Sequence, residues 1–160
     1  MMKHIFSPAM PSTYAKQEIH TLEISESIAD FFGENFGEEC KISTKLTEDG
    51  FVSVSYEGFA CLLREISKSL FDSATLKFEI KSESKKFSID IFREKRIKLR
   101  ERDIAKLSDI AEMSGFAFEI SKNKITLSAD IKRSASLPIY ARDRSIMYKA
   151  FVRMFYVAVG

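Results

Sequence analysis

The sequence has no tryptophan, and its 160 residues include only two cysteines, three prolines and six glycines. Cys40 and Cys61 have no partner at disulfide or metal-ligand spacing, which is typical of reduced thiols in a cytosolic protein. No stretch reaches the roughly 18 uninterrupted apolar residues of a membrane-spanning helix. The first residues also lack the continuous apolar core of a secretion signal. We therefore expect a cytoplasmic protein without a transmembrane segment.

An excess of charge of one sign is also missing, because 25 basic residues face 23 acidic ones and leave a formal net charge of +2. That balance is too small to favour nucleic acid as a partner. His4 and His20 are isolated, so a metal site is not expected. What the chain has is 45% hydrophobic residues, including fourteen phenylalanines. This composition predicts one globular unit with a Phe-rich core.

Hydrophobic periodicity predicts three helices and six strands in the main part of the chain. The helices fall at 14–36, with a possible break at 23–25, and at 57–73 and 101–114. The strands fall at 40–46, 51–55, 76–81, 87–92, 116–121 and 124–131. Asp49-Gly50 predicts a hairpin between the first two strands, and the polar connection 82–85 predicts a second hairpin.

This element order predicts an α+β fold, a two-layer α/β sandwich whose mixed, mainly antiparallel sheet carries helices on one face. Residues 1–13 are predicted to be a loop because of their Pro, Ser and Thr content. Residues 14–132 form the main domain. Residues 133–160 form a connector and a C-terminal amphipathic helix, which Asp143 or Ser145 can begin.

Two segments resemble the histidine-kinase-type ATPase superfamily, which includes the ATPase domains of gyrase and heat-shock chaperones. The stretch from Leu62 to Ala74 resembles the N-box helix of this superfamily, where polar residues four apart face the nucleotide and its magnesium. Those positions are Glu65 and Ser69, which share one helix face. The resemblance implies that Glu65 corresponds to the general base of the gyrase branch, and that Ser69 replaces the magnesium-binding Asn. The stretch from Ile104 to Ile120 resembles the helix-glycine-strand segment after the ATP lid.

The chain departs from this family where the nucleotide should bind. The stretch between Ile89 and Lys106 has no glycine, and 92–97 has neither Asp nor Gly where the family has Asp-x-Gly-x-Gly. The long lid of the family is also missing. Backbone that wraps phosphate needs conformations that glycine supplies most easily. We therefore predict a degenerate ATPase-like domain without a cofactor.

The function predicted from these departures is a non-catalytic regulatory or protein-interaction module in a bacterial signalling pathway. The alternative is a nucleotide-binding domain with a shortened lid, in which Glu65 orients a water and Ser69 contacts the magnesium of ATP. Between the predicted strand and the next helix, a basic run indicates a surface for an anionic ligand or partner, or else a solvated loop. Its residues are Arg93, Lys95, Arg96, Lys98, Arg100 and Arg102.

The C-terminal helix has an apolar surface so wide that something must cover it. One cover is the sheet or N-terminal segment of the same chain, and another is a membrane surface with basic residues at the headgroups. The third is the same helix of a second copy in a two-fold dimer. In that third case the interface residues are Met147, Phe151, Met154 and Phe155. Self-association or a protein partner is therefore expected.

Overall fold

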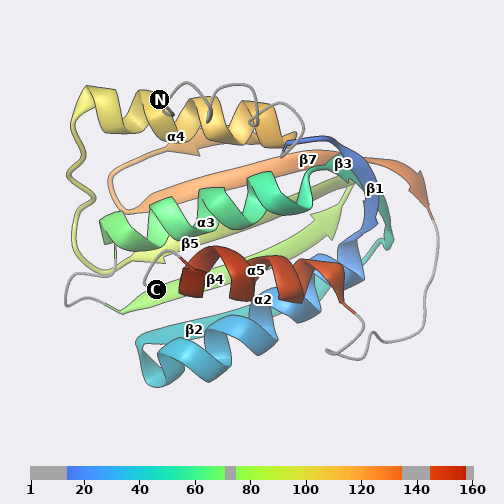
Figure 1. Cartoon of the computed structure of the whole chain (residues 1–160), viewed down its shortest axis with the longest axis horizontal. Coiled ribbons are helices and arrows are strands. Elements are labelled where there is room, and N and C mark those ends of the chain that lie inside the picture. Colours follow the sequence, from blue (N-terminus) through green and yellow to red (C-terminus); the bar gives the residue numbers. More distant parts are fainter. Residues whose placement is uncertain (1–13, 71–74, 135–144, 158–160) are drawn as a thin grey trace.

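The computed structural model describes residues 14–70, 75–134 and 145–157, which form a helical layer on one face of a mixed sheet (Figure 1). The sheet has seven strands in the order β1-β3-β7-β5-β4-β2, and β6 pairs with β7 off this path. The predicted two-layer α/β sandwich is therefore confirmed. Its strands are β1 (Gln17–His20), β2 (Cys40–Leu46), β3 (Gly50–Val54), β4 (Leu76–Glu83), β5 (Lys86–Arg93), β6 (Ala117–Ile120) and β7 (Lys124–Ser134). Its helices are α2 (Thr21–Phe36), a 3-10 turn η2 (Gly37–Glu39), α3 (Tyr56–Leu70), α4 (Glu101–Ser114) and α5 (Ile146–Val157).

The hairpin predicted around Asp49-Gly50 is wrong. Strand β2 pairs in parallel with β4, while β3 pairs with β1 and β7 on the other side of the sheet. Gly50 serves a close approach instead of a tight hairpin, because a Cβ there would lie 2.5 Å from the carbonyl oxygen of Arg133 on β7. The second predicted hairpin is confirmed as β4 and β5, whose register runs from Leu76 opposite Arg93 to Glu83 opposite Lys86.

The helix predicted to start near Tyr14 begins later, at Thr21, because residues 17–20 form the edge strand β1. The His20 side chain ends that strand and caps the helix, since its Nδ1 accepts the Leu22 N–H at 3.1 Å. The predicted break at 23–25 is absent, and Ser25 Oγ donates to the Thr21 carbonyl at 2.8 Å. The apolar spacing of Ile19 and Leu22 mimicked a helix across this strand-to-helix junction.

Helix α4 occupies its predicted range, and Gly115 ends it with a left-handed φ of 101°. The Gly115 N–H caps the helix by donating to carbonyls of the last turn, which is why glycine is favoured at this position. Between helices and sheet lies a Phe-rich core, as the composition predicted. Phe32, for example, lies 5.1 Å from Phe78 between ring centroids, and Phe31 lies 4.8 Å from Phe155.

Helix α5 packs against α2 and α3 of the same chain (Figure 1). Ser145 begins it as predicted, because its Oγ accepts the Tyr148 N–H at 3.0 Å. Met147 and Phe151 are fully buried in this packing, so these two predicted interface residues are unavailable to a second subunit. Met154 and Phe155 are only partly buried, and self-association through them stays a prediction. In the part of the chain that the structure describes, no helix is long and apolar enough to cross a membrane.

Candidate functional site between helices α3 and α4

Helices α3 and α4 lie side by side on the sheet and pack closely at Gly58. A Cβ on Gly58 would lie 2.5 Å from Ser114 Oγ and from the Tyr14 ring. Ser55 begins α3, because its Oγ accepts the Gly58 N–H at 2.9 Å. This packing turns the face that carries Cys61 and Glu65 toward α4.

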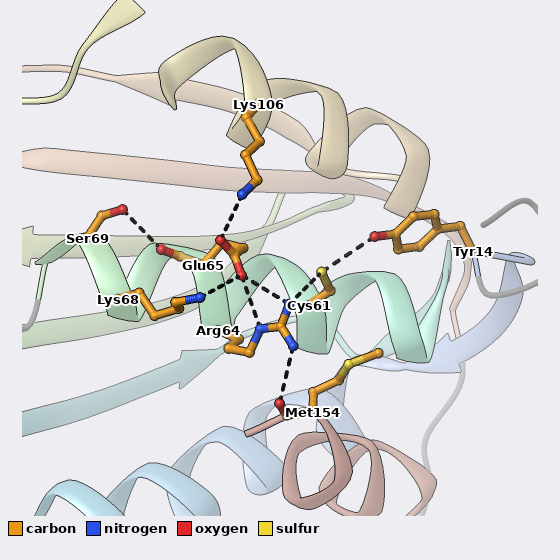
Figure 2. A network of polar contacts seen from close by, with 8 residues as sticks. All are labelled: Tyr14, Cys61, Arg64, Glu65, Lys68, Ser69, Lys106 and Met154. Carbon is orange, nitrogen blue, oxygen red and sulfur yellow. Dashed lines mark hydrogen bonds and ion pairs between the residues drawn. The ribbon is translucent and has the colours of Figure 1, made fainter. Parts of the chain in front are cut away.

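Glu65 lies at the centre of a cluster of cations (Figure 2). Its Oε1 is 3.1 Å from Lys106 Nζ on α4. Its Oε2 is 3.0 Å from an Arg64 guanidinium nitrogen and 3.6 Å from Lys68 Nζ. Only 12% of the Glu65 side chain is exposed. The predicted site residue is therefore an ion-pair centre that joins α3 to α4.

The pKa of Glu65 follows from two opposing effects. Burial raises it, but the hydrogen bond and charge of Lys106, with the charges of Lys68 and Arg64, outweigh burial and hold it below the ordinary value of a glutamate. A general base works best when its pKa lies near the operating pH. A carboxylate stabilised in its charged form by three cations is a weak proton acceptor at neutral pH.

Ser69 lies one turn further along α3, as the four-residue spacing predicted. Its Oγ donates to the Glu65 carbonyl at 3.1 Å, so the hydroxyl is tied to its own helix (Figure 2). Magnesium prefers several free oxygen ligands in near-octahedral geometry. Glu65 already binds three cations and Ser69 offers one hydrogen-bonded hydroxyl, so this pair does not fit Mg-ATP. Among the described residues, no group of three or more His, Cys, Asp or Glu side chains could hold a metal ion.

A cavity of about 560 Å³ lies in the groove beside Glu65. Its walls come from α3, α4 and Tyr14, which lies three residues before β1. Tyr14 OH donates to Cys61 Sγ at 3.4 Å on one wall, and burial, followed by this hydrogen bond, raises the pKa of Tyr14. Arg64 donates to the Met154 carbonyl at 3.4 Å and so connects the groove to α5. The lining residues are Tyr14, Cys61, Arg64, Glu65, Arg102, Ala105, Lys106, Asp109, Ile110 and Met113.

The other cysteine, Cys40, lies apart from this groove at the start of β2. Its thiol is 6% exposed, and burial raises its pKa to about 12. Cys61 is half-buried. The two thiols therefore differ in access to solvent.

Arg93 does not belong to the basic surface that was predicted to bind an anionic ligand or partner. It is the last residue of β5, opposite Leu76, and alternation along the strand turns its side chain to the core face with Ile89 and Ile91. It is 8% exposed, and its guanidinium donates to the Arg96 carbonyl at 3.1 Å. The remaining residues of the predicted surface are exposed, namely Lys95, Arg96, Lys98, Arg100 and Arg102.

The segment 94–100 that joins β5 to α4 is fixed to the turn between β6 and β7. The Ile97 N–H donates to the Lys122 carbonyl at 2.7 Å, and the Asn123 side chain donates to the Arg93 carbonyl at 3.1 Å. Ile97 is 8% exposed and belongs to the hydrophobic core. This segment occupies the place in the sequence where the resembled family has its ATP lid.

Several residues of the site were missed by sequence reasoning. Lys106 was unnoticed because its partner Glu65 lies 41 positions away. Glu23 was treated as part of a helix break, yet it is 4% exposed and its Oε2 accepts the Met147 N–H at 2.9 Å. The amphipathic period of α4 predicted which residues face the core, but it gave no indication of pairs between helices.

No protein-family model matches the sequence, and no curated protein matches it either. Solved structures do match. The histidine kinase AdeS of Acinetobacter baumannii superposes with a TM-score of 0.53 and 16% identity over 74% of this chain and 68% of that chain. The nucleotide-free catalytic domain of histidine kinase ThkA gives a TM-score of 0.51 and 12% identity, covering 74% of this chain and 97% of that one.

A third match is ThkA in complex with the response regulator TrrA, with a TM-score of 0.50 and 13% identity over 81% of this chain and 45% of that chain. At these identities the likeness shows the fold alone. The protein has the fold of the catalytic ATPase domain of histidine kinases, as the sequence resemblance implied.

Proposed function

We propose that this protein is a non-catalytic regulatory or protein-interaction module built on a histidine-kinase ATPase-like fold. The observation that carries the proposal is the connection between β5 and α4. Segment 94–100 has no glycine, buries Ile97 and is hydrogen-bonded to the β6–β7 turn. A lid that wraps phosphate needs adaptable backbone and free N–H groups at that point.

The contacts of Glu65 support the same proposal. A residue that activates water must be free to accept a proton, but this carboxylate is occupied by Arg64, Lys68 and Lys106. The ion pair between Glu65 and Lys106 therefore spans the groove between α3 and α4, beside the cavity. We assign Glu65 a structural role in joining the two helices.

A protein partner in a bacterial signalling pathway is the setting we propose. The similarity to a kinase solved with its response regulator supports this class of partner, although that complex belongs to ThkA. A module that binds another protein needs a stable fold and an accessible surface, and it does not need a nucleotide.

The alternative is a nucleotide-binding domain with a shortened lid, and the cavity beside Glu65 is the observation that favours it. Thermal melting of the whole chain with and without millimolar Mg-ATP separates the two functions. A ligand at about 100 times its dissociation constant adds about 2.7 kcal/mol to the free energy of unfolding. We expect no change in the melting temperature. A rise that disappears when ATP is replaced by inorganic phosphate would overturn the non-catalytic proposal.

A further inference from the structure

The sheet face opposite the helices carries a row of three lysines and one phenylalanine that come from four strands. In the sheet register Lys41 lies opposite Lys77, Lys77 opposite Phe92, and Phe92 opposite Lys124. Residues directly opposite each other point to the same face, with about 5 Å between neighbours. Leu76 and Phe78, the neighbours of Lys77 along β4, are buried on the face that the helices cover, so the row lies on the opposite face of the sheet.

The row surrounds one aromatic ring with cations. Lys124 Nζ lies 5.7 Å from the ring centroid of Phe92, at cation-π distance. Phe92 is half-buried, whereas Lys41 and Lys77 are exposed. Lys77 also forms an ion pair with Glu79 at 2.9 Å. The row therefore combines an accessible ring edge with ammonium groups on both sides of it.

More positive charge gathers at the same end of the sheet. Segment 94–100 and the β6–β7 turn meet there, because Ile97 is hydrogen-bonded to Lys122. Segment 94–100 follows the end of β5, which holds Phe92. The β6–β7 turn precedes the start of β7, which holds Lys124. They add exposed basic side chains, against the single exposed carboxylate of Glu94. We call the whole set the basic end; it consists of Lys41, Lys77, Phe92, Lys95, Arg96, Lys122 and Lys124.

We propose that the basic end is the docking surface for an acidic protein segment that places an apolar side chain against Phe92. This inference rests on the proposed function as an interaction module and names its surface. The carboxylates of such a segment meet the ammonium groups of Lys41 and Lys124. Its apolar side chain covers the exposed edge of the ring.

The neighbouring row on the same face favours protein over nucleic acid as the occupant. About 7 Å along the strands lies a row that contains Glu79, Asp90 and Glu119. Asp90 is bound to Lys81 at 3.3 Å and to Thr126 at 2.7 Å, so this acidic row is fixed in place. A uniform polyanion would be repelled by that row. A protein segment can place neutral or basic residues over it.

A hollow of about 520 Å³ adjoins Lys124 at the junction of the two rows. Its lining changes from the cation of Lys124 to the carboxylate of Glu119, with Thr126 between them. A ligand of one charge would not match both ends of such a hollow. This change of sign over a short distance agrees with a partner whose side chains alternate in charge. The lining residues are Glu119, Ile120, Ser121, Lys124 and Thr126.

The test measures binding of a short fluorescein-labelled peptide, an acidic Glu-Leu-Asp segment followed by a Ser-Lys segment, to the full chain by fluorescence anisotropy at low salt. The double substitution Lys41→Glu with Lys124→Glu should weaken binding about tenfold, with a smaller loss at physiological salt. The matched control is Lys45→Glu with Lys86→Glu, which makes the same charge change in other rows of this face. It should change the affinity less than about twofold. Phe92→Ser should weaken binding without altering its salt dependence.

The melting temperature of each variant is compared with that of the parent protein. If Lys41→Glu with Lys124→Glu melts at a lower temperature, the pair Lys41→Gln with Lys124→Gln takes its place. Equal losses in the row variant and its control would overturn the proposal, because they would show charge attraction without a defined site. Tighter binding of a fluorescein-labelled oligo-dT than of the peptide would overturn it in favour of nucleic acid. So would absence of peptide binding at low salt. The peptide measurement contains no Mg-ATP. Absence of peptide binding and a rise in melting temperature with Mg-ATP are therefore separate outcomes.

Discussion

At the scale of single residues, Glu65 shows both the reach and the limit of sequence reasoning. Helical spacing placed it correctly on the same face as Ser69. The spacing gave no indication of Lys106, which arrives from a separate helix, or of the resulting change in charge environment. A catalytic role depends on that environment, and the family resemblance implied a general base, for the alternative function, where the structure has an ion-pair centre.

Substitution Glu65→Gln should lower stability at neutral pH and do so much less in acid. The folded-state pKa of Glu65 lies below its unfolded value of about 4.3. The charged form therefore contributes stability that is present above the unfolded pKa and lost as the pH falls through the folded one. We expect a loss of about 1–2 kcal/mol at pH 7, since three cations lose their shared partner. Urea unfolding of both proteins, repeated from neutral pH down to below 4, measures this difference.

The control is Glu112→Gln on the exposed side of α4, which should change stability by less than about 0.5 kcal/mol at any pH. The contrary result is an equal loss of stability from Glu65→Gln at acid and neutral pH. That result would mean that Glu65 stabilises the fold through packing or uncharged hydrogen bonds, and not through its charge.

Arg93 is a second residue whose environment differs from the one predicted. The run of basic residues suggested one continuous surface, but strand alternation from Phe87 through Ile89 and Ile91 puts Arg93 on the core face. Counting alternate positions one step further along the strand would have predicted this. The exposed positions after it, where no strand continues, were predicted correctly.

At the scale of elements, helices and strands were largely predictable but strand partners were not. Periodicity depends on local contacts with one core and is visible in sequence. Pairing depends on which distant strands share an edge, and a turn signal such as Asp49-Gly50 fits both a hairpin and a close crossing. The error at β1 has a similar cause, because a short edge strand followed at once by a helix has no clear period of its own.

The prediction at the scale of elements concerns the hydrogen bonds by which Glu23 on α2 holds the start of α5. Glu23 accepts hydrogen bonds from the Met147 N–H, from Ser145 Oγ at 3.1 Å and from Tyr56 OH at 3.1 Å. Glu23→Ala removes the acceptor of two buried donors, the Met147 N–H and Ser145 Oγ, and of the part-buried Tyr56 OH, and it removes a negative charge from the N-terminus of α5. We expect a loss of about 2–3 kcal/mol in urea unfolding and faster hydrogen exchange in 146–157.

Glu26→Ala, one turn along α2 and only half-buried, is the matched control and should leave exchange in α5 unchanged. Unchanged α5 exchange in Glu23→Ala as well would mean that aromatic packing, and not this carboxylate, holds the helix.

At the scale of the whole molecule, the two faces of the sheet differ. One face carries all four of the described α-helices and the core (Figure 1). The strand register places alternating rows of charge on the other face. The sequence predicted this two-layer arrangement because apolar and polar residues alternate along β4. It could not predict the basic row, since Lys41, Lys77 and Lys124 come together only through the strand order.

Whether α5 is an appendage or part of the domain is also a property of the whole molecule. Sequence reasoning separated residues 133–160 from the main domain, yet Phe151 contacts the rings of Phe31, Phe32 and Phe59 inside one core. A shared core predicts one cooperative unfolding transition. Phe151→Leu should cost about 1–2 kcal/mol and lower the melting temperature of the entire protein by about 3–6 °C, with the calorimetric and van't Hoff enthalpies still equal. If α5 were an independent appendage, the substitution would instead produce a small early transition and leave the main one in place, so differential scanning calorimetry of this single variant distinguishes the two arrangements.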